Sequence, residues 1–305
     1  FREIGLAPAG DAGAYRQAVP LEEQTIDYSA SRAWLIDRSG TERPVALGRD
    51  MIVSAGGGPR AATSDAPLVF LGYGMHLPEF GHDDFEGVDL RGKIAVVIGG
   101  GPAAIPAPVR ANQRKERTRI LERAGAVGLI MLTPPKLVEI PWDRQLLLAR
   151  QSQMYLSEPG LRDMPDGFFL ASFDPGTSET LFAGSGYDFA SLAAAADASA
   201  PLPKFELGYR LKAEVAAQRR LLTSPNLVAM LAGSDPRLAA EYVVLSAHLD
   251  HVGIGPEIGG DAIYNGAIDD GSGVASVLDI ATKLAAGPRP KRSILILVVT
   301  AEEPG

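Results

Sequence analysis

The stretch ILILVVTAEE, residues 294–303, joins a near-continuous apolar run to two adjacent acidic residues. An apolar run of this length is typical of a strand inside a sheet that is covered on both faces. Thr300 and Ala301 follow the run, and Glu302 and Glu303 come directly after them. A buried strand therefore delivers two carboxylates to the point where it leaves its sheet.

The segments before this strand predict the rest of its fold. Residues 272–287, SGVASVLDIATKLAAG, carry apolar residues on one face at helical spacing, and Gly287 and Pro288 end the helix. Before the helix, residues 242–251, YVVLSAHLDH, form a second apolar strand that runs into charged residues. A strand, helix, strand order predicts two parallel strands in one sheet, with their carboxyl ends at the same edge. We therefore expect an α/β domain with a three-layer αβα architecture.

Two stretches rich in glycine, proline, serine and alanine, residues 54–67 and 198–204, divide the chain. Between them, PLVFLGYG, KIAVVIGG and VGLIML predict strands, and RKERTRILERAG predicts a helix that ends at Gly125. Alternating stretches before them predict hairpin strands. We expect lead-in strands in residues 1–50, a separate α/β domain in 51–204 and the domain with the paired glutamates in 205–305.

The composition excludes several classes of function. A chain of 305 residues with 46% apolar and 22% charged residues can bury a sizeable core and form two domains. Its net charge of −8 argues against a nucleic-acid partner, and the basic run Arg114–Arg119 is interpreted as a solvated helix face. No apolar run reaches the roughly 18 residues of a membrane span. Without cysteine, a metal would be held by His, Asp and Glu.

One motif resembles a dinucleotide-binding fingerprint. Residues 96–104, VVIGGGPAA, fit a strand followed by G-x-G-x-x-A. We reject a cofactor there, because Pro106 and Pro108 interrupt the segment where a phosphate-binding helix has to begin. The following strand also ends without an acidic residue to bind a ribose. A glycine-rich loop is the simpler interpretation.

Residues that can do chemistry gather at the predicted strand ends. His248 lies where the first strand ends, and because side chains alternate along a strand, Asp250 is predicted to point to the same side and to orient the imidazole. Asp269 lies in YNGAIDDGSG, residues 264–273, just before the helix. Taken alone, each motif also fits a plain role, a strand-end histidine or an acidic helix cap. With Glu302 and Glu303 they converge on one sheet edge, where carboxylates so crowded require a cation.

Adjacent glutamates can divide two tasks. One side chain can ligate a metal while its neighbour takes a proton from water that the metal has acidified. With nitrogen and oxygen ligands alone, zinc is the leading metal, and cobalt and manganese are alternatives.

The motifs SAHLDHVG, YNGAIDDGSG and VVTAEEPG, in this order and spacing, closely resemble the co-catalytic zinc aminopeptidases, a family that includes glutamate carboxypeptidase. The resemblance implies two divalent ions, with His248 on one, Glu303 on the other and Asp269 bridging both. It implies that Glu302 is the general base and that Asp250 orients His248. It also implies a cis peptide bond after Asp269.

The middle of the chain resembles a protease-associated domain, an insert that many members of this family carry. GHDDFEGVDLRGKIAVVIGG, residues 81–100, and RILERAGAVGLIML, residues 119–132, are similar to its usual strands and helix. The resemblance makes residues 51–204 the insert and 205–305 the N-terminal half of the catalytic domain. The family's two remaining ligands, an Asp or Glu and a His, are expected after Gly305, in a longer protein.

These features predict a metal-dependent aminopeptidase that acts on peptides. A carboxypeptidase or a one-metal glutaminyl cyclase of the same fold, and a receptor-like binding protein without catalysis, are the alternatives. The intact set of His248, Asp269, Glu302 and Glu303 disfavours the last two. Because family members with this insert are usually exported, we expect a periplasmic or extracellular protein.

Overall fold

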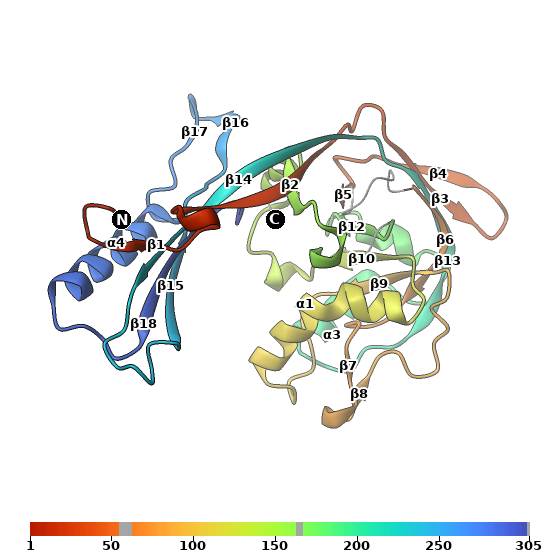
Figure 1. Cartoon of the computed structure of the whole chain (residues 1–305). Coiled ribbons are helices and arrows are strands. Elements are labelled where there is room, and N and C mark those ends of the chain that lie inside the picture. The colour runs from red at the N-terminus through yellow and green to blue at the C-terminus, as the bar shows by residue number, and fades with distance from the viewer. Residues whose placement is uncertain (55–62, 163–166, 304–305) are drawn as a thin grey trace. The chain divides into compact units, whose positions relative to one another are not determined.

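The computed structural model describes residues 1–54, 63–162 and 167–303. The chain divides into two compact units (Figure 1). Unit 1 comprises Phe1–Glu23, Gln153–Glu158 and Arg219–Gly305, and unit 2 comprises Gln24–Ser152 and Pro159–Gln218. The predicted boundary at residues 54–67 falls largely on 55–62, outside the described residues. The expected insert bounds, 51–204, stay a prediction.

Unit 1 is built on one sheet with the strand order β11-β2-β14-β18-β15, and β1 pairs with β14. Its strands are β1 (Ala7–Pro8), β2 (Arg16–Ile26), β11 (Gln153–Leu156), β14 (Ala217–Leu231), β15 (Tyr242–His248) and β18 (Ser293–Val299). A separate hairpin is formed by β16 (Gly253–Ile258) and β17 (Asp261–Tyr264), and η1 covers Asp11–Gly13. β18 runs antiparallel to β14 and parallel to β15, which confirms the predicted parallel pair.

The helix α4 (Gly271–Ala286) lies between β15 and β18 in the chain and packs against the sheet that they form (Figure 1). Its buried residues Val277 and Ala281 pack with Ala247 of β15 and with Ile294 and Ile296 of β18. The alternation of apolar residues along β18 explains this packing, because side chains at every second position share a face. The α/β class predicted for this part of the chain is confirmed. Among the described residues of unit 1, α4 supplies the helical layer.

Two strands of unit 1 continue across the boundary into unit 2. β2 crosses it after Glu23 and β14 crosses it before Arg219, and the two strands are neighbours in the sheet. Arg220 Nε lies 2.7 Å from Glu23 Oε2, and Arg219 Nη1 lies 3.4 Å from Glu22 Oε1. The chain therefore leaves unit 1 and returns to it through adjacent strands.

Unit 2 contains an eight-stranded sheet with the order β4-β3-β13-β6-β9-β10-β12-β5. Its strands are β3 (Arg32–Asp37), β4 (Glu42–Val45), β5 (Met51–Ser54), β6 (Thr63–Phe70), β9 (Ile94–Ile98), β10 (Gly128–Leu132), β12 (Phe169–Phe173) and β13 (Phe205–Glu214). The α-helices are α1 (Ala107–Arg123), α2 (Trp142–Leu148) and α3 (Phe189–Asp197). Short 3-10 turns cover Pro78–Phe80, Pro135–Leu137, Pro159–Leu161 and Ser178–Phe182, and β7 (His76–Leu77) pairs with β8 (His82–Asp83).

Parallel strands form the centre of this sheet, and both of its faces are buried. β9 pairs in parallel with β6 and with β10, and β10 pairs in parallel with β12. Ile94, Val96 and Ile98 enter one hydrophobic core, whereas Ala95 and Val97 enter another. The continuous apolar run of this strand follows from burial on both faces.

Two details of α1 differ from the sequence-based expectations. The helix begins at Ala107, with Pro106 at its N-cap and Pro108 in its first turn, so these prolines start the helix instead of interrupting it. Proline fits there because the first N–H groups of a helix have no intrahelical partner. This removes one of the two grounds on which we rejected the dinucleotide motif, and the missing acidic residue remains.

The second detail is Arg117, which lies inside the run interpreted as solvated but is 2% exposed. Its Nη1 contacts Met131 Sδ at 3.1 Å. Its Nε and Nη2 are buried without a hydrogen-bond partner among the described residues. Burial, helped by the nearby Arg114, lowers the pKa of Arg117 to about 10.

In the described ranges, no helix is long and apolar enough to cross a membrane.

Candidate metal centre

The ends of β15 and β18 bring the predicted site residues together. His248 is the last residue of β15 and pairs in register with Val299, the last residue of β18. The residue after β15 stays close to the end of β18, because Leu249 N–H donates to Val299 O at 2.9 Å. The turn with Glu302 and Glu303 therefore leaves the sheet beside His248.

The imidazole of His248 is surrounded by carboxylates. Its Nε2 lies 3.0 Å from Asp269 Oδ1, 3.7 Å from Glu302 Oε2 and 4.0 Å from Asp270 Oδ2. The His248 side chain is 12% exposed, so this crowding takes place at the partly covered edge of the sheet.

Three of these residues form a group that could hold a metal ion. One ligand atom each from His248, Glu302 and Glu303 lies within 4.8 Å of the others. Zinc bonds of about 2 Å place ligand atoms roughly 3 to 4 Å apart, so the three side chains lie at separations close to those around a metal centre. The predicted convergence of His248, Asp269, Glu302 and Glu303 is present in the structure.

The two aspartates of the turn before α4 make different contacts. Asp270 is the N-cap of α4, with its Oδ1 accepting from Gly273 N–H at 3.0 Å. Its Oδ2 accepts from His248 N–H at 3.1 Å, so the same side chain ties the helix to the end of β15. Asp269 is left to face His248, and the peptide bond between the two aspartates is cis, as the resemblance implies. The double role of Asp270 was not predicted from the sequence.

Asp250 acts on His248 in a different way from the one expected. β15 ends at His248, so the alternation of side chains does not extend to Asp250. Its backbone carbonyl, and not its carboxylate, lies 3.0 Å from His248 Nδ1. An Nδ1–H that donates to this carbonyl leaves Nε2 with the lone pair that a metal needs. The Asp250 carboxylate instead accepts from Glu303 N–H at 3.1 Å through Oδ2.

His251 is a second residue that sequence reasoning left without a role. Its Nδ1 lies 2.7 Å from Glu303 Oε1. The only signal in the sequence was its spacing, three residues after His248 in HLDH. Strand alternation could not place it, because the chain turns after His248.

The backbone that carries the glutamates is fixed on both sides. Thr300 N–H donates to Asn226 Oδ1 at 3.0 Å, and the Thr300 hydroxyl contacts the Ser224 hydroxyl at 2.7 Å. Ala301 then adopts a φ of +60°, a left-handed conformation that costs a non-glycine residue about 1 kcal/mol. Such conformations persist where the surroundings enforce them, and they concentrate at functional sites.

The electrostatics favour a positive charge at this edge. Desolvation acts to lower the pKa of His248, but the Asp250 carbonyl and the carboxylates of Asp269, Glu302 and Asp270 outweigh it and raise the pKa. Asp250 Oδ1 is buried without a hydrogen-bond partner among the described residues. Oxygen and nitrogen donors gathered in this way fit zinc, cobalt or manganese.

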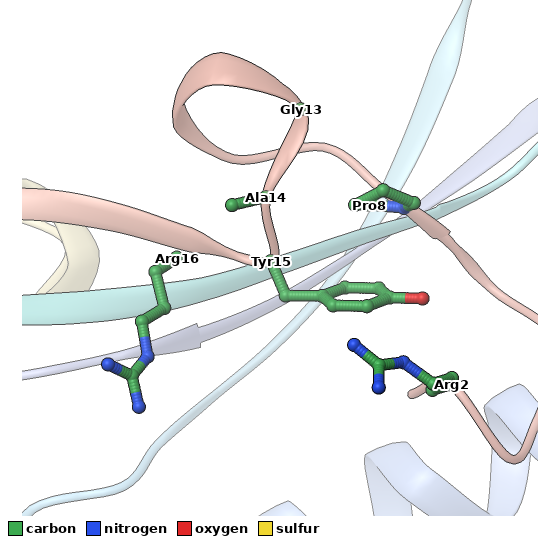
Figure 2. A pocket seen from close by; sticks show the side chains of 6 residues that line it. All are labelled: Arg2, Pro8, Gly13, Ala14, Tyr15 and Arg16. Atoms are coloured by element: carbon green, nitrogen blue, oxygen red, sulfur yellow. The ribbon is translucent and has the colours of Figure 1, made fainter.

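Two surface pockets are lined by other residues. One, of about 520 Å³ in unit 1, is lined by Arg2, Pro8, Gly13, Ala14, Tyr15 and Arg16 (Figure 2). It offers no carboxylate or imidazole, and its Tyr15 hydroxyl already donates to Leu6 O at 2.7 Å. The other, of about 370 Å³ in unit 2, lies beside Glu206 and Arg210. Neither pocket contains a predicted site residue.

Comparisons with known proteins point to the same segment. Residues 226–305, which hold every predicted site residue, match the model of Peptidase family M28. This confirms the resemblance for that segment. No curated protein sequence matches the chain.

Among solved structures, the chain is similar to an aminopeptidase from Aneurinibacillus sp. strain AM-1, with 18% identity and a TM-score of 0.45. It is also similar to BSAP, a zinc aminopeptidase from Bacillus subtilis, with 18% identity and a TM-score of 0.40. All of this chain is covered in both cases, but only 55% and 53% of those chains. The chain thus spans about half the length of these two structures.

Proposed function

We propose that this chain, whose residues 226–305 match the model of Peptidase family M28, forms part of a metal-dependent exopeptidase that removes N-terminal residues from peptides. The observation that carries the proposal is the convergence of His248, Glu302 and Glu303 on one small volume at the ends of two parallel strands. Carboxyl ends of such strands are where α/β sheets place their sites.

The proposed site holds two divalent ions, with zinc the leading candidate. His248 would bind one ion, Glu303 the other, and Asp269 both. A cation bound there supplies the positive charge that acidifies a water molecule and polarises the scissile carbonyl. The chain's own part is to hold the ligands. The Asp250 carbonyl orients His248, and Asp270 fixes the backbone of His248 to the start of α4.

The two glutamates differ in a way that supports separate tasks. Glu303 is 20% exposed, its N–H is held by Asp250 and its carboxylate contacts His251. The Glu302 side chain is 58% exposed, and its Oε2 lies 3.7 Å from His248 Nε2. A carboxylate held in this way is pre-organised to bind a metal, whereas the exposed carboxylate of Glu302 is open to a water molecule. We therefore assign Glu302 to take the proton from the attacking water and pass it to the leaving amine.

The overall proposal is tested with the full-length protein on aminoacyl-arylamides and N-blocked dipeptides, each with and without chelator. We expect cleavage of the free N-terminal substrates and its loss with chelator. Turnover that resists chelator would contradict the metal mechanism. Cleavage of N-blocked substrates alone would favour a carboxypeptidase.

The base is tested by Glu302→Gln, which keeps the shape of the side chain but cannot accept the proton. Turnover should fall by about 10² to 10⁴-fold, the usual contribution of a general base, while metal content is retained. Glu241→Gln is the matched control, because Glu241 is paired with Arg292 at the far end of the strand pair and should leave activity unchanged. Full activity in the Glu302 variant would disprove the assignment.

We further propose that residues 51–204 form the protease-associated insert and that the protein is exported. Both rest on the resemblance of residues 81–100 and 119–132 to that domain. Fractionation of the source cells with an antibody against the protein tests the second.

A further inference from the structure

We propose that His251 is a positioning residue that holds Glu303 in the orientation needed to bind a metal. The inference rests on the proposed metal function of Glu303. His251 Nδ1 and Glu303 Oε1 are 2.7 Å apart, a short distance for a nitrogen–oxygen hydrogen bond. A neutral imidazole with its proton on Nδ1 donates to one carboxylate oxygen and leaves the other for a cation.

Glu303 is held by one short turn at two points. Its backbone N–H donates to Asp250 Oδ2 at 3.1 Å, and its carboxylate contacts His251. Asp250 and His251 are consecutive residues of the turn that follows β15. The turn that begins at one ligand, His248, therefore positions another ligand that comes from the end of β18.

Gly266 packs closely against His251 and so helps to fix its position. A Cβ at Gly266 would lie 2.8 Å from both Cβ and Cγ of His251, closer than a real side chain can approach. Gly266 also has a φ of +64°. The backbone that leads to Asp269 therefore packs directly against the imidazole, and His251 connects all three sequence motifs of the site.

The geometry separates a positioning role from a ligand role. His251 contacts the Glu303 carboxylate through Nδ1 at 2.7 Å, whereas His248 Nε2 lies 3.0 Å from Asp269 Oδ1 and 3.7 Å from Glu302 Oε2. A glutamate side chain has several rotatable bonds, so fixing it before the metal arrives reduces the entropy lost on binding. Outer partners of metal ligands typically account for about 10- to 100-fold in metal affinity.

The test uses two polar substitutions of His251 in the full-length protein. His251→Asn places an amide N–H near the position of Nδ1, whereas His251→Gln places it near Nε2, out of line with Glu303. We expect His251→Gln to weaken binding of Zn²⁺ and Co²⁺ by about 10- to 100-fold in calorimetric titrations. His251→Asn should stay close to the wild-type affinity. His76→Asn is the control, because His76 makes a similar contact with Asp83, at 3.0 Å, in unit 2.

The visible spectrum of the Co²⁺-loaded protein is the second readout. A positioning role predicts that fully loaded His251→Gln keeps the wild-type band positions. A changed ligand-field spectrum would mean that His251 is itself a ligand and would overturn the proposal. Equal affinities for the Asn and Gln variants, or no metal binding by the wild type, would also overturn it. If the variants behave as expected but peptides are not cleaved, the proposed peptidase function fails and the positioning role stands.

Discussion

At the scale of single residues, Arg117 is a charge in an apolar layer. It lies on the buried face of α1 with two nitrogens unpartnered among the described residues, and a buried charge without a full set of partners is costly. We expect Arg117→Met, which keeps the length of the side chain, to raise the free energy of unfolding by about 1 to 3 kcal/mol in urea titrations. Arg117→Ala should lower it by leaving a cavity. A clear loss of stability in the Met variant would show that the guanidinium stabilises unit 2.

Asp84 gives a pH-dependent prediction at the same scale. It is 4% exposed, and burial raises its pKa against the opposing effects of the Met75 N–H and of His82. A raised folded-state pKa means tighter proton binding in the folded protein. Stability relative to Asp84→Asn should therefore rise as pH falls through that pKa, and be lost again as pH rises. Urea unfolding from neutral pH to about pH 4 measures the slope.

Asp89 is the control with the opposite sign. Its hydrogen bonds with Arg91 lower its pKa to about 2. Its stabilising effect should therefore be present above pH 3.8 and be lost as pH falls toward about 2, so that Asp89→Asn shows the reverse slope when the titration is extended to about pH 2. Parallel slopes for the two variants would contradict the pKa directions.

At the scale of elements, the caps of two helices can be compared. Asp270 caps α4 and also accepts from His248 N–H, whereas Asp188 caps α3 by accepting from the N–H and the hydroxyl of Ser191. Loss of a cap costs about 0.5 to 2 kcal/mol, so both alanine variants should be destabilised. Only Asp270→Ala should also weaken Zn²⁺ binding, because it frees the end of β15. Equal zinc affinities for the two variants, measured by calorimetry, would show that the tie to His248 is immaterial.

The same scale shows what the sequence could and could not predict. Parallel pairing of β15 and β18 followed from two apolar runs and one helix between them, so the convergence of His248 with the glutamates was predictable. The contacts of Asp250 and His251 were not, because they depend on where β15 ends and the chain turns. Arg117 was misplaced because a run of charges does not reveal which one faces the sheet. The distinct tasks of Glu302 and Glu303 stay predictions.

At the scale of the whole molecule, the predicted metal ligands lie in one unit and two of the hydrophobic cores lie in the other. All predicted ligands lie in unit 1, and the two cores of unit 2 contain none of them. A ligand at 100 times its dissociation constant stabilises the state that binds it by about 2.7 kcal/mol. We expect Zn²⁺ to slow amide hydrogen exchange in peptides from residues 219–303 and not in those from 63–152. His248→Ala should abolish this protection, and protection spread evenly over both units would contradict the assignment.

The adjacent crossings of β2 and β14 have a consequence for how such a chain can change over evolution. Glu23 and Arg220 are held within 2.7 Å of each other, so the two cut ends of unit 1 are already neighbours. A gene that lost residues 24–218 could close the gap with a two-residue hairpin turn and would remove the edge strand β11 and the adjoining ends of β2 and β14 from the sheet. Conversely, a hairpin at this place can accept a whole domain at little cost in loop-closure entropy. The strand pair is thus a place in the chain where an accessory domain can be gained, lost or exchanged.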